Sequence, residues 1–308
     1  MCIRDSNREY DMITDDILKQ KPLTPSQWGR KIAWRHAVGV TAVSFALFPL
    51  IWMISASFDT LGSLSSQKLI PDRPGLDNFR ELFGNPDQPY LKWLRNSLII
   101  SSTNAVLQMF IGATAAYALS RFRFKGRKLT LMTILVVQMF PQLLAATAIF
   151  LMLAELGKSI PALALGQTTA LIIVFAGGAL GINAWMLKGF YDTIPSEIDE
   201  SAKVDGASHA QIYFKIILPL ARPVLAVITL LSFIGTMNEF LITSVILGGN
   251  QNAITLAVGM QQFIDGQYNA RWGPFAAGAL IASVPVMILF LYLQKHVVSG
   301  LTAGANKG

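Results

Sequence analysis

Six long runs of uncharged, mostly apolar residues constrain this sequence more than any other feature. A helix needs about 20 such residues to cross the hydrocarbon core of a bilayer, and each run reaches that length. Backbone N–H and C=O groups find no water inside lipid, so each run is predicted to be helical. Glu239 is the only Asp, Glu, Lys or Arg within them. The six predicted spans are Ala37–Ser57, Asn96–Ser120, Leu129–Ala154, Ile160–Leu187, Pro223–Gly249 and Trp272–Gln294.

The composition agrees with a membrane protein. Of the 308 residues, 14% are charged, whereas soluble domains carry about 25%. We predict an all-α integral membrane fold, with a six-helix membrane domain at 37–294 between an N-terminal segment, 1–36, and a C-terminal tail, 295–308. The net charge is +7, and the excess basic residues flank the uncharged runs. This pattern favours a lipid bilayer over a nucleic acid as the partner of the basic residues.

The sequence shows no motif that is typical of a metal or cofactor site. The single cysteine, Cys2, excludes an internal disulfide and a cysteine zinc site. The three histidines show no metal-ligand spacing. Gly157-Lys158-Ser159 resembles the end of a phosphate-binding loop, but Met152 stands where that motif needs glycine. We predict no metal, no cofactor and no ATP on this chain.

The distribution of Lys and Arg orients the predicted spans. Basic residues accumulate in the cytoplasmic loops of membrane proteins. With the N-terminus inside, the cytoplasmic segments hold eighteen of them and the outer loops hold seven. The loop Arg121–Lys128 alone holds five. Both termini are therefore predicted to be cytoplasmic.

The cytoplasmic loop at 188–222 has the signals of a built structure rather than of a plain connector. Ser196 is predicted to cap a helix whose first turn is rich in carboxylates. Gly206 suits a left-handed C-cap, and Ser208 is predicted to cap a second helix that runs to Pro219. Two short helices at an angle, exposed on the cytoplasmic face, indicate a docking element.

The spacing within this loop carries a resemblance. Bacterial ABC importer permeases have a motif of Glu-Ala-Ala, three residues, Gly, nine residues, then Ile-x-Leu-Pro. The sequence here reads Glu200-Ser201-Ala202, Gly206 and Ile216-Ile217-Leu218-Pro219, with both spacings intact and Ser201 as the one departure. From about Phe45 onward the chain also resembles the smaller permease of maltose/maltodextrin-type ABC sugar importers. The most similar stretches are Gln138–Pro141, Thr255–Gln262 and Gly300–Gly304.

The resemblance implies a type I ABC importer permease fold and an assembly in the bacterial cytoplasmic membrane. A second permease would complete the path, two ATPase subunits would bind ATP and Mg, and an extracytoplasmic binding protein would deliver the sugar. The chain itself would not be an enzyme. The resemblance assigns ATPase coupling to Glu200, Ser201, Ala202, Asp205, Gly206, Ile216, Leu218 and Pro219. It also implies that the C-terminal tail reaches the interface between the two ATPase subunits. The tail residues concerned are Leu301, Thr302, Ala303 and Gly304.

The outer loop before the last span mixes polar groups with aromatic rings. Such a mixture suits a sugar, whose hydroxyls need hydrogen bonds and whose C–H faces pack on rings. The residues alone favour an interfacial re-entry with aromatics at the headgroups. The resemblance favours a loop that enters the cleft of the binding protein and helps to release the sugar. The residues concerned are Gln262, Phe263, Ile264, Asp265, Gly266, Gln267, Tyr268 and Asn269.

Polar residues inside the spans are candidates for the transport path. An intramembrane charge such as Glu239 is costly and usually faces a cavity or a partner, although a structural hydrogen bond is the competing interpretation. Pro141 is predicted to kink the third span. The path candidates are Gln138, Gln142, Asn238 and Glu239, and Asn104, Gln108 and Asn183 are candidates for the path or for interhelical contacts.

Two other classes of membrane protein compete with a permease subunit. An ion-coupled secondary transporter is expected to show internal repeats and an ion or proton relay in its helices. No clear repeat is visible, and a lone Glu239 makes a poor relay. A membrane-embedded enzyme would need catalytic groups that converge at one depth, and none do in this sequence.

A membrane-impermeant maleimide tests the predicted orientation. In a Cys2→Ser background, Ser63→Cys should react from outside the cell and Lys125→Cys should not. The reverse labelling pattern would refute the orientation, and with it the docking role of the loop at 188–222.

Overall fold

The chain is built from helices in the parts that its computed structural model describes, which are residues 29–60, 68–265 and 270–305. These residues contain no β-strand, and Asp59 and Pro74 form only an isolated bridge. The chain divides into two compact units, Met1–Met53 and Ile54–Gly308, with the boundary inside helix α3 (Trp34–Phe58). In the first unit a π-helical turn, η1 (Gly29–Ala33), precedes α3. Residues 1–28 of the predicted N-terminal segment lie outside the described residues.

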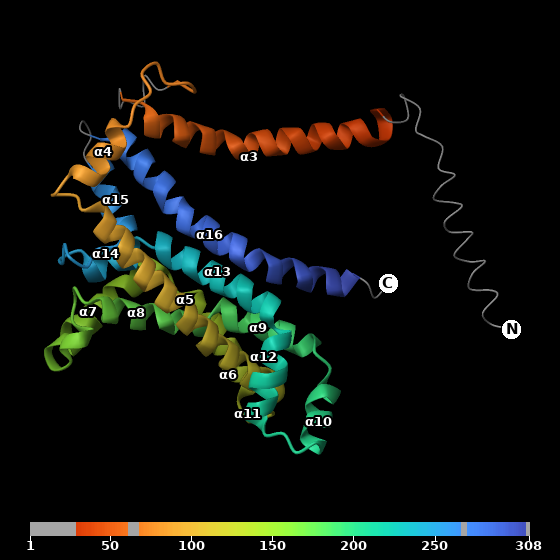
Figure 1. The fold of residues 1–308 in the computed structure, drawn as a ribbon. Helices are drawn as coiled ribbons and strands as arrows, with labels where there is room; N and C mark the ends of the chain where they lie inside the picture. The colour runs from red at the N-terminus through yellow and green to blue at the C-terminus, as the bar shows by residue number, and fades with distance from the viewer. Residues whose placement is uncertain (1–28, 61–67, 266–269, 306–308) are drawn as a thin grey trace. The chain divides into compact units, whose positions relative to one another are not determined.

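The second unit contains the other helices (Figure 1). The first group is α4 (Asp77–Gly84), α5 (Tyr90–Arg121), α6 (Arg127–Gln138), α7 (Gln142–Ser159), η2 (Pro161–Leu163), α8 (Thr168–Gly177), η3 (Gly178–Leu180) and α9 (Ile182–Thr193). The second group is α10 (Ser196–Val204), α11 (His209–Ile212), η4 (Tyr213–Ile217), α12 (Leu218–Leu220), α13 (Arg222–Asn238), α14 (Leu241–Leu247), α15 (Leu256–Ile264) and α16 (Trp272–Ala305).

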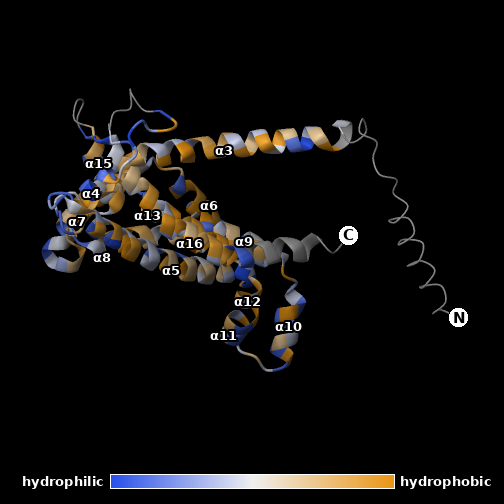
Figure 2. Cartoon of the chain, turned by 45° about the horizontal axis from the view of Figure 1, so that its top comes forward, coloured by the Kyte–Doolittle hydropathy of each residue, from blue (hydrophilic) through white to orange (hydrophobic). Residues whose placement is uncertain are grey.

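Several helices are long enough to cross a membrane. Within the described residues, four segments pass by length and composition, and the number reaches six if each of two bent helix pairs is one span. Long hydrophobic stretches are visible along α5, α13 and α16 (Figure 2). The helix α16 continues through Ala305, so its backbone includes the predicted tail residues Leu301, Thr302, Ala303 and Gly304.

The third predicted span is broken rather than merely kinked. The helix α6 ends at Gln138, α7 begins at Gln142, and the two helical segments are bent by 99°. Pro141 has no N–H to continue the ladder of α6, and Phe140 closes the helix end with a bond to the Val137 carbonyl. The side chain of Gln142 lies outside the described residues.

Two further predicted spans are also interrupted. The run Ile160–Leu187 becomes η2, α8, η3 and α9, and its main break lies at Gly178–Gly181. The run Pro223–Gly249 becomes α13 and α14, because Glu239 has an extended backbone that ends the first helix. The segment Thr168–Thr193 still counts as one candidate span despite its break. The prediction of a continuous helix over Pro223–Gly249 was wrong.

The helix α5 lies at the centre of the second unit. It packs against α13 on one side and α9 on another, and α13 packs in turn against α16. The end of this bundle that carries α4 and α15 lies opposite the end that carries α10 and α11 (Figure 1). Three buried apolar clusters fill the bundle, one near each of these ends and one between α5, α7, α8 and α14.

The N-terminal end of α5 is fixed by close contacts. Trp93 is fully buried, and its ring meets Phe263 of α15 edge-on at a centroid distance of 6.1 Å. The Tyr90 hydroxyl donates to the Gly278 carbonyl of α16 at 2.7 Å. A Cβ at Gly259 would come within 2.2 Å of the Trp93 ring. The backbone of α15 therefore approaches α5 as closely as glycine permits.

Replacement of Gly259 by alanine tests this close approach. Gly259→Ala forces the Trp93 ring to move, and overpacking of this kind costs about 1–3 kcal/mol. Thermal unfolding of the purified protein should begin at a lower temperature. Gly189→Ala in α9 is the matched control, because its Cβ meets nothing within 4 Å and alanine favours a helix interior. Equal unfolding temperatures for the two variants would contradict the packing described here.

Candidate functional site

We call the loop at 188–222 the docking loop, after its predicted role. Its first helix, α10, starts and ends with defined backbone geometry. Pro195 holds the N-cap position, and its carbonyl accepts a bond from Ile198. Ser196 makes no capping bond, so that part of the prediction was wrong. At the other end Gly206 adopts a φ of +83°, the left-handed conformation predicted for it. The Ala207 N–H bonds the Ala202 carbonyl across this turn at 2.9 Å, as in a Schellman motif.

The second helical stretch of the loop begins with the predicted cap. The Ser208 hydroxyl accepts from the Gln211 N–H, and the Gln211 side chain accepts from the Ser208 N–H, which completes a capping box. Consecutive helical turns α11, η4 and α12 then lead to Ala221. This stretch is bent by 78° from α13. The sequence prediction of two short helices is confirmed.

The two faces of the docking loop differ. One face belongs to a buried apolar cluster shared with α5, α9 and α13, in which Tyr213 packs on Tyr117 of α5 at a ring distance of 4.8 Å. The other face is exposed and includes the apolar side chain of Val204, which is 87% exposed. Of the predicted coupling residues, Glu200, Ser201, Asp205 and Gly206 are exposed, Ala202 is buried, and Ile216, Leu218 and Pro219 are half-buried.

A buried ion pair joins this loop to α5. The Nε atom of Arg121 lies 2.7 Å from Oδ2 of Asp199, and the side chains are only 13% and 8% exposed. The N–H is not aligned for a hydrogen bond, so the contact is an ion pair without that bond. The Nη2 atom of Arg121 also donates to the Ile194 carbonyl at the end of α9, at 3.0 Å. Arg121 therefore connects the end of α5 with both α9 and α10.

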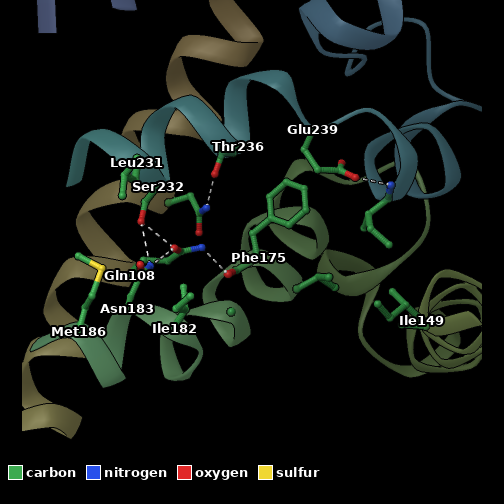
Figure 3. A pocket seen from close by; sticks show the side chains of 16 residues that line it. Gln108, Ile149, Phe175, Ile182, Asn183, Met186, Leu231, Ser232, Thr236 and Glu239 are labelled. Atoms are coloured by element: carbon green, nitrogen blue, oxygen red, sulfur yellow. Dashed lines mark hydrogen bonds between the residues drawn. The ribbon is translucent and has the colours of Figure 1, made fainter. Parts of the chain in front are cut away.

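A cavity of about 510 Å³ lies between α5, α7, α8, α9, α13 and α14. Three polar side chains from three helices point toward one another on its wall (Figure 3). Oε1 of Gln108 accepts from the Ser232 hydroxyl at 2.8 Å and from Nδ2 of Asn183 at 3.1 Å. The Gln108 Nε2 atom donates to the Phe175 carbonyl at 2.9 Å. Asn104, buried beside them, bonds Thr236 through Nδ2.

The structure separates Glu239 from Asn238. Glu239 lines the cavity, and its carboxylate accepts from the N–H groups of Ile242 and Thr243 at 2.7 and 2.9 Å. The structural hydrogen bond that competed with a path role is thus present. Asn238 instead lines a second cavity of about 360 Å³ between α13, α15 and α16. Gln138, at the end of α6, lines neither of these two cavities.

The predicted release loop is partly helical. Gln262, Phe263 and Ile264 belong to α15, and Asp265 ends that helix with an exposed side chain. The Phe263 ring is 1% exposed and packs on Trp93, so its expected place on an exposed loop was wrong. Gly266, Gln267, Tyr268 and Asn269 lie outside the described residues.

The described residues hold no group of three or more His, Cys, Asp or Glu side chains that could bind a metal ion. Sequence reasoning missed Arg121 and Asp199 as a pair, and it missed Ser232 and Thr236 as partners of the amides on α5. Asp199 had been interpreted only as one of several carboxylates at a helix start. A serine and a threonine four residues apart on one helix were the signal for a polar stripe facing α5.

A bundle of apolar helices with a structured loop of two short helices and a polar cavity is typical of the membrane component of a transporter. Residues 108–302 match the family described as binding-protein-dependent transport system inner membrane component. The chain belongs to this family, and it is the permease subunit of an ABC importer. The predicted family and the all-α membrane fold are confirmed.

Relatives and a solved structure agree with this assignment. The maltose/maltodextrin transport system permease protein MalG of Vibrio vulnificus is 38% identical over 304 residues, which cover 95% of this chain and 99% of MalG. The galactooligosaccharides transport system permease protein GanQ of Bacillus subtilis is 41% identical over 263 residues, 85% of this chain and 90% of GanQ. The crystal structure of a bacterial ABC transporter involved in the import of alginate matches with a TM-score of 0.72 at 24% identity. The match covers 90% of this chain and 99% of the alginate transporter chain, and it supports the fold.

A double-mutant cycle tests the buried ion pair. Asp199→Leu or Arg121→Met alone leaves one buried charge unpaired, which costs about 3–5 kcal/mol. The double variant removes both charges and should lose much less stability than the two single effects added together. Thermal unfolding of the purified complex measures this. Additive losses would show that the two side chains do not interact.

Proposed function

We propose that this permease passes a sugar across the membrane together with a second permease, two ATPase subunits and an extracytoplasmic sugar-binding protein. ATP and Mg are bound by the ATPase subunits. Relatives named for maltodextrin and galactooligosaccharide transport support an oligosaccharide of neutral hexoses as the cargo. The observation that carries the proposal is the docking loop, whose one face is packed on the bundle while Glu200, Ser201 and Val204 remain exposed on the other.

The buried face of the loop explains how movement of an ATPase subunit reaches the bundle. The helix α10 is joined to α5 through the Arg121–Asp199 pair, and η4 is packed on α5 through Tyr213 and Tyr117. Force applied to the exposed face of α10 is therefore transmitted to the ends of α5 and α9. The packing makes the loop and these helix ends move as one body, since packed cores transmit strain.

The same proposal orients the chain. A docking loop in the cytoplasm places the C-terminal end of α5 and both chain termini on that side. The tail residues Leu301, Thr302, Ala303 and Gly304 extend α16 toward the ATPase subunits, and we assign them a contact there. On the outer side, Gln262, Asp265 and the loop that follows contact the sugar-binding protein.

The left-handed turn at Gly206 provides the test of the docking role. A Cβ at this position meets nothing within 4 Å, so Gly206→Ala strains only the backbone, by about 1–2 kcal/mol. We expect it to reduce receptor-stimulated ATP hydrolysis and uptake severalfold in the reconstituted importer. Gly206→Asn should retain more activity, because asparagine tolerates the left-handed conformation.

Gly126 gives a matched control for the same backbone strain. It has a φ of +93°, meets nothing within 4 Å, and lies in the other cytoplasmic loop, before α6. Gly126→Ala should leave hydrolysis and uptake coupled. If Gly206→Ala and Gly126→Ala behave alike at equal protein levels in the membrane, the docking role of the loop is wrong.

A further inference from the structure

The loop between α5 and α6 holds cations that the fold itself does not use. Five of its eight residues, 121–128, are Lys or Arg. Arg121 is used inside the protein, where it pairs with Asp199 of α10. The other four form no ion pair with any residue that the structure describes. Three of them are exposed, and we call these the exposed cations: Arg123, Lys125 and Lys128.

Two acids near this loop already have partners. Asp192, at the end of α9, accepts from the Ser120 hydroxyl at 2.6 Å and pairs with Lys188, and Asp199 pairs with Arg121. Exposed cations in other loops differ, because each has an acid three or four residues away. The exposed cations of the α5–α6 loop are therefore available to an anion from outside the chain. The paired cations are Lys68 with Asp72, Arg80 with Asp77 and Lys158 with Glu155.

A tight turn fixes the backbone that carries the exposed cations. The Arg127 N–H donates to the Phe124 carbonyl, and Gly126 has φ and ψ of 93° and −5°. These angles are typical of the third residue of a type II turn, which places Lys125 second and the other two exposed cations on either side. Cations on an ordered turn lose less conformational freedom when they bind an anion, which favours binding.

The surroundings of this turn are those of a membrane surface. No residue of α6 is buried, and its apolar side chains Leu129, Met132 and Val136 are exposed. Phe122 and Phe124 are also exposed, and they alternate with the cations. An apolar helix that begins beside aromatic rings and basic side chains is typical of the boundary between hydrocarbon and headgroups. The turn is therefore expected at the depth of the lipid phosphates.

The turn is also held to the docking loop. The Phe122 ring packs edge-on against Tyr117 of α5 at 5.8 Å and against His209 of α11 at 5.2 Å. Together with the Arg121–Asp199 pair, these contacts fix the turn to both helices of the docking loop. An anion bound at the turn would therefore bind a part of the protein whose position is set by packing.

A lipid with a net negative charge fits these conditions better than a zwitterionic lipid. A choline or ethanolamine headgroup carries its own cation beside the phosphate, whereas a glycerol headgroup leaves the phosphate charge unpaired. Basic clusters at the cytoplasmic end of a span attract anionic lipids, by about fivefold in affinity for each Lys or Arg. We propose that Arg123, Lys125 and Lys128 form a binding site for the headgroup of an anionic phospholipid. The inference takes from the proposed function only that this headgroup belongs to the cytoplasmic leaflet.

Lipid binding to the purified importer tests the site. The complex is delipidated in detergent and titrated with phosphatidylglycerol or with phosphatidylcholine, and bound lipid is counted by native mass spectrometry. The triple variant Arg123→Gln, Lys125→Gln, Lys128→Gln should bind phosphatidylglycerol at least about tenfold more weakly than the wild type, since each cation contributes about fivefold. Binding of phosphatidylcholine should be equal in the two proteins.

Two further variants separate the site from net charge and from folding. The triple variant Lys68→Gln, Arg80→Gln, Lys158→Gln removes the same charge from cations that already have an acidic partner, and it should bind phosphatidylglycerol as the wild type does. A variant that exchanges Lys for Arg and Arg for Lys at the three proposed positions should also bind normally. Unchanged binding in the first triple variant, or an equal loss in this charge-matched control, would overturn the site.

Other anionic partners give different results. Inorganic phosphate in large excess should not displace phosphatidylglycerol, and displacement would show a site for a free anion instead. Loss of the ATPase subunits from the first triple variant, with phosphatidylglycerol binding unchanged, would show a protein contact instead. Either result would overturn the lipid site.

Uptake of maltodextrins and galactooligosaccharides by the reconstituted wild-type importer is measured in parallel. Uptake without selective binding of phosphatidylglycerol would overturn the lipid site and leave the proposed function standing. Selective binding without uptake of any of these sugars would overturn the proposed function and leave the lipid site standing, because detergent gives the lipid access to the loop whichever side it faces.

Discussion

Backbone groups at the ends and breaks of helices have no partner within their own helix, and in this chain α5 bonds several of them. Neighbouring helices begin, end or break beside α5. Polar side chains spaced along α5 bond these groups from its N-terminal half to its C-terminal end. The three bonds are Ser97 Oγ with the Leu256 N–H, Gln108 Nε2 with the Phe175 carbonyl, and Arg121 Nη2 with the Ile194 carbonyl.

This role makes α5 the element that connects the functional regions. Its N-terminal end holds α15 through Trp93, its middle supplies two amides to the cavity, and its C-terminal end holds the docking loop through Arg121. A load on the docking loop and a change in the cavity wall therefore act on the same helix. Coupling between an ATPase and a transport path needs such a shared, rigid element, because packed helices transmit displacement with little compression.

The sequence predicted the membrane class, the two short helices of the loop at 188–222 and the left-handed turn at Gly206, because charge, spacing and glycine act locally. It predicted a kink at Pro141 but not the full break there, and it did not predict the break at Glu239, since average hydropathy does not register a single residue that ends a helix. Asp199 resembled a helix-start carboxylate because its partner, Arg121, is distant in sequence. Phe263 lay among polar residues and was expected on the surface, yet α15 turns it onto Trp93. The Asn104–Thr236 and Gln108–Ser232 pairs required three-dimensional positions.

The proposed function requires the exposed face of α10 to contact an ATPase subunit in the cytoplasm. A cross-link from Val204 tests it most directly, because this side chain is 87% exposed at the end of α10. In a Cys2→Ser background, Val204→Cys is treated with a short bis-maleimide in the purified importer, and the product is identified by mass spectrometry. We expect a cross-link to the ATPase subunit that the parent without Val204→Cys does not form. If that cross-link is absent in a complex that still contains the ATPase, or if Val204→Cys is linked to the extracytoplasmic receptor, α10 is not the docking helix.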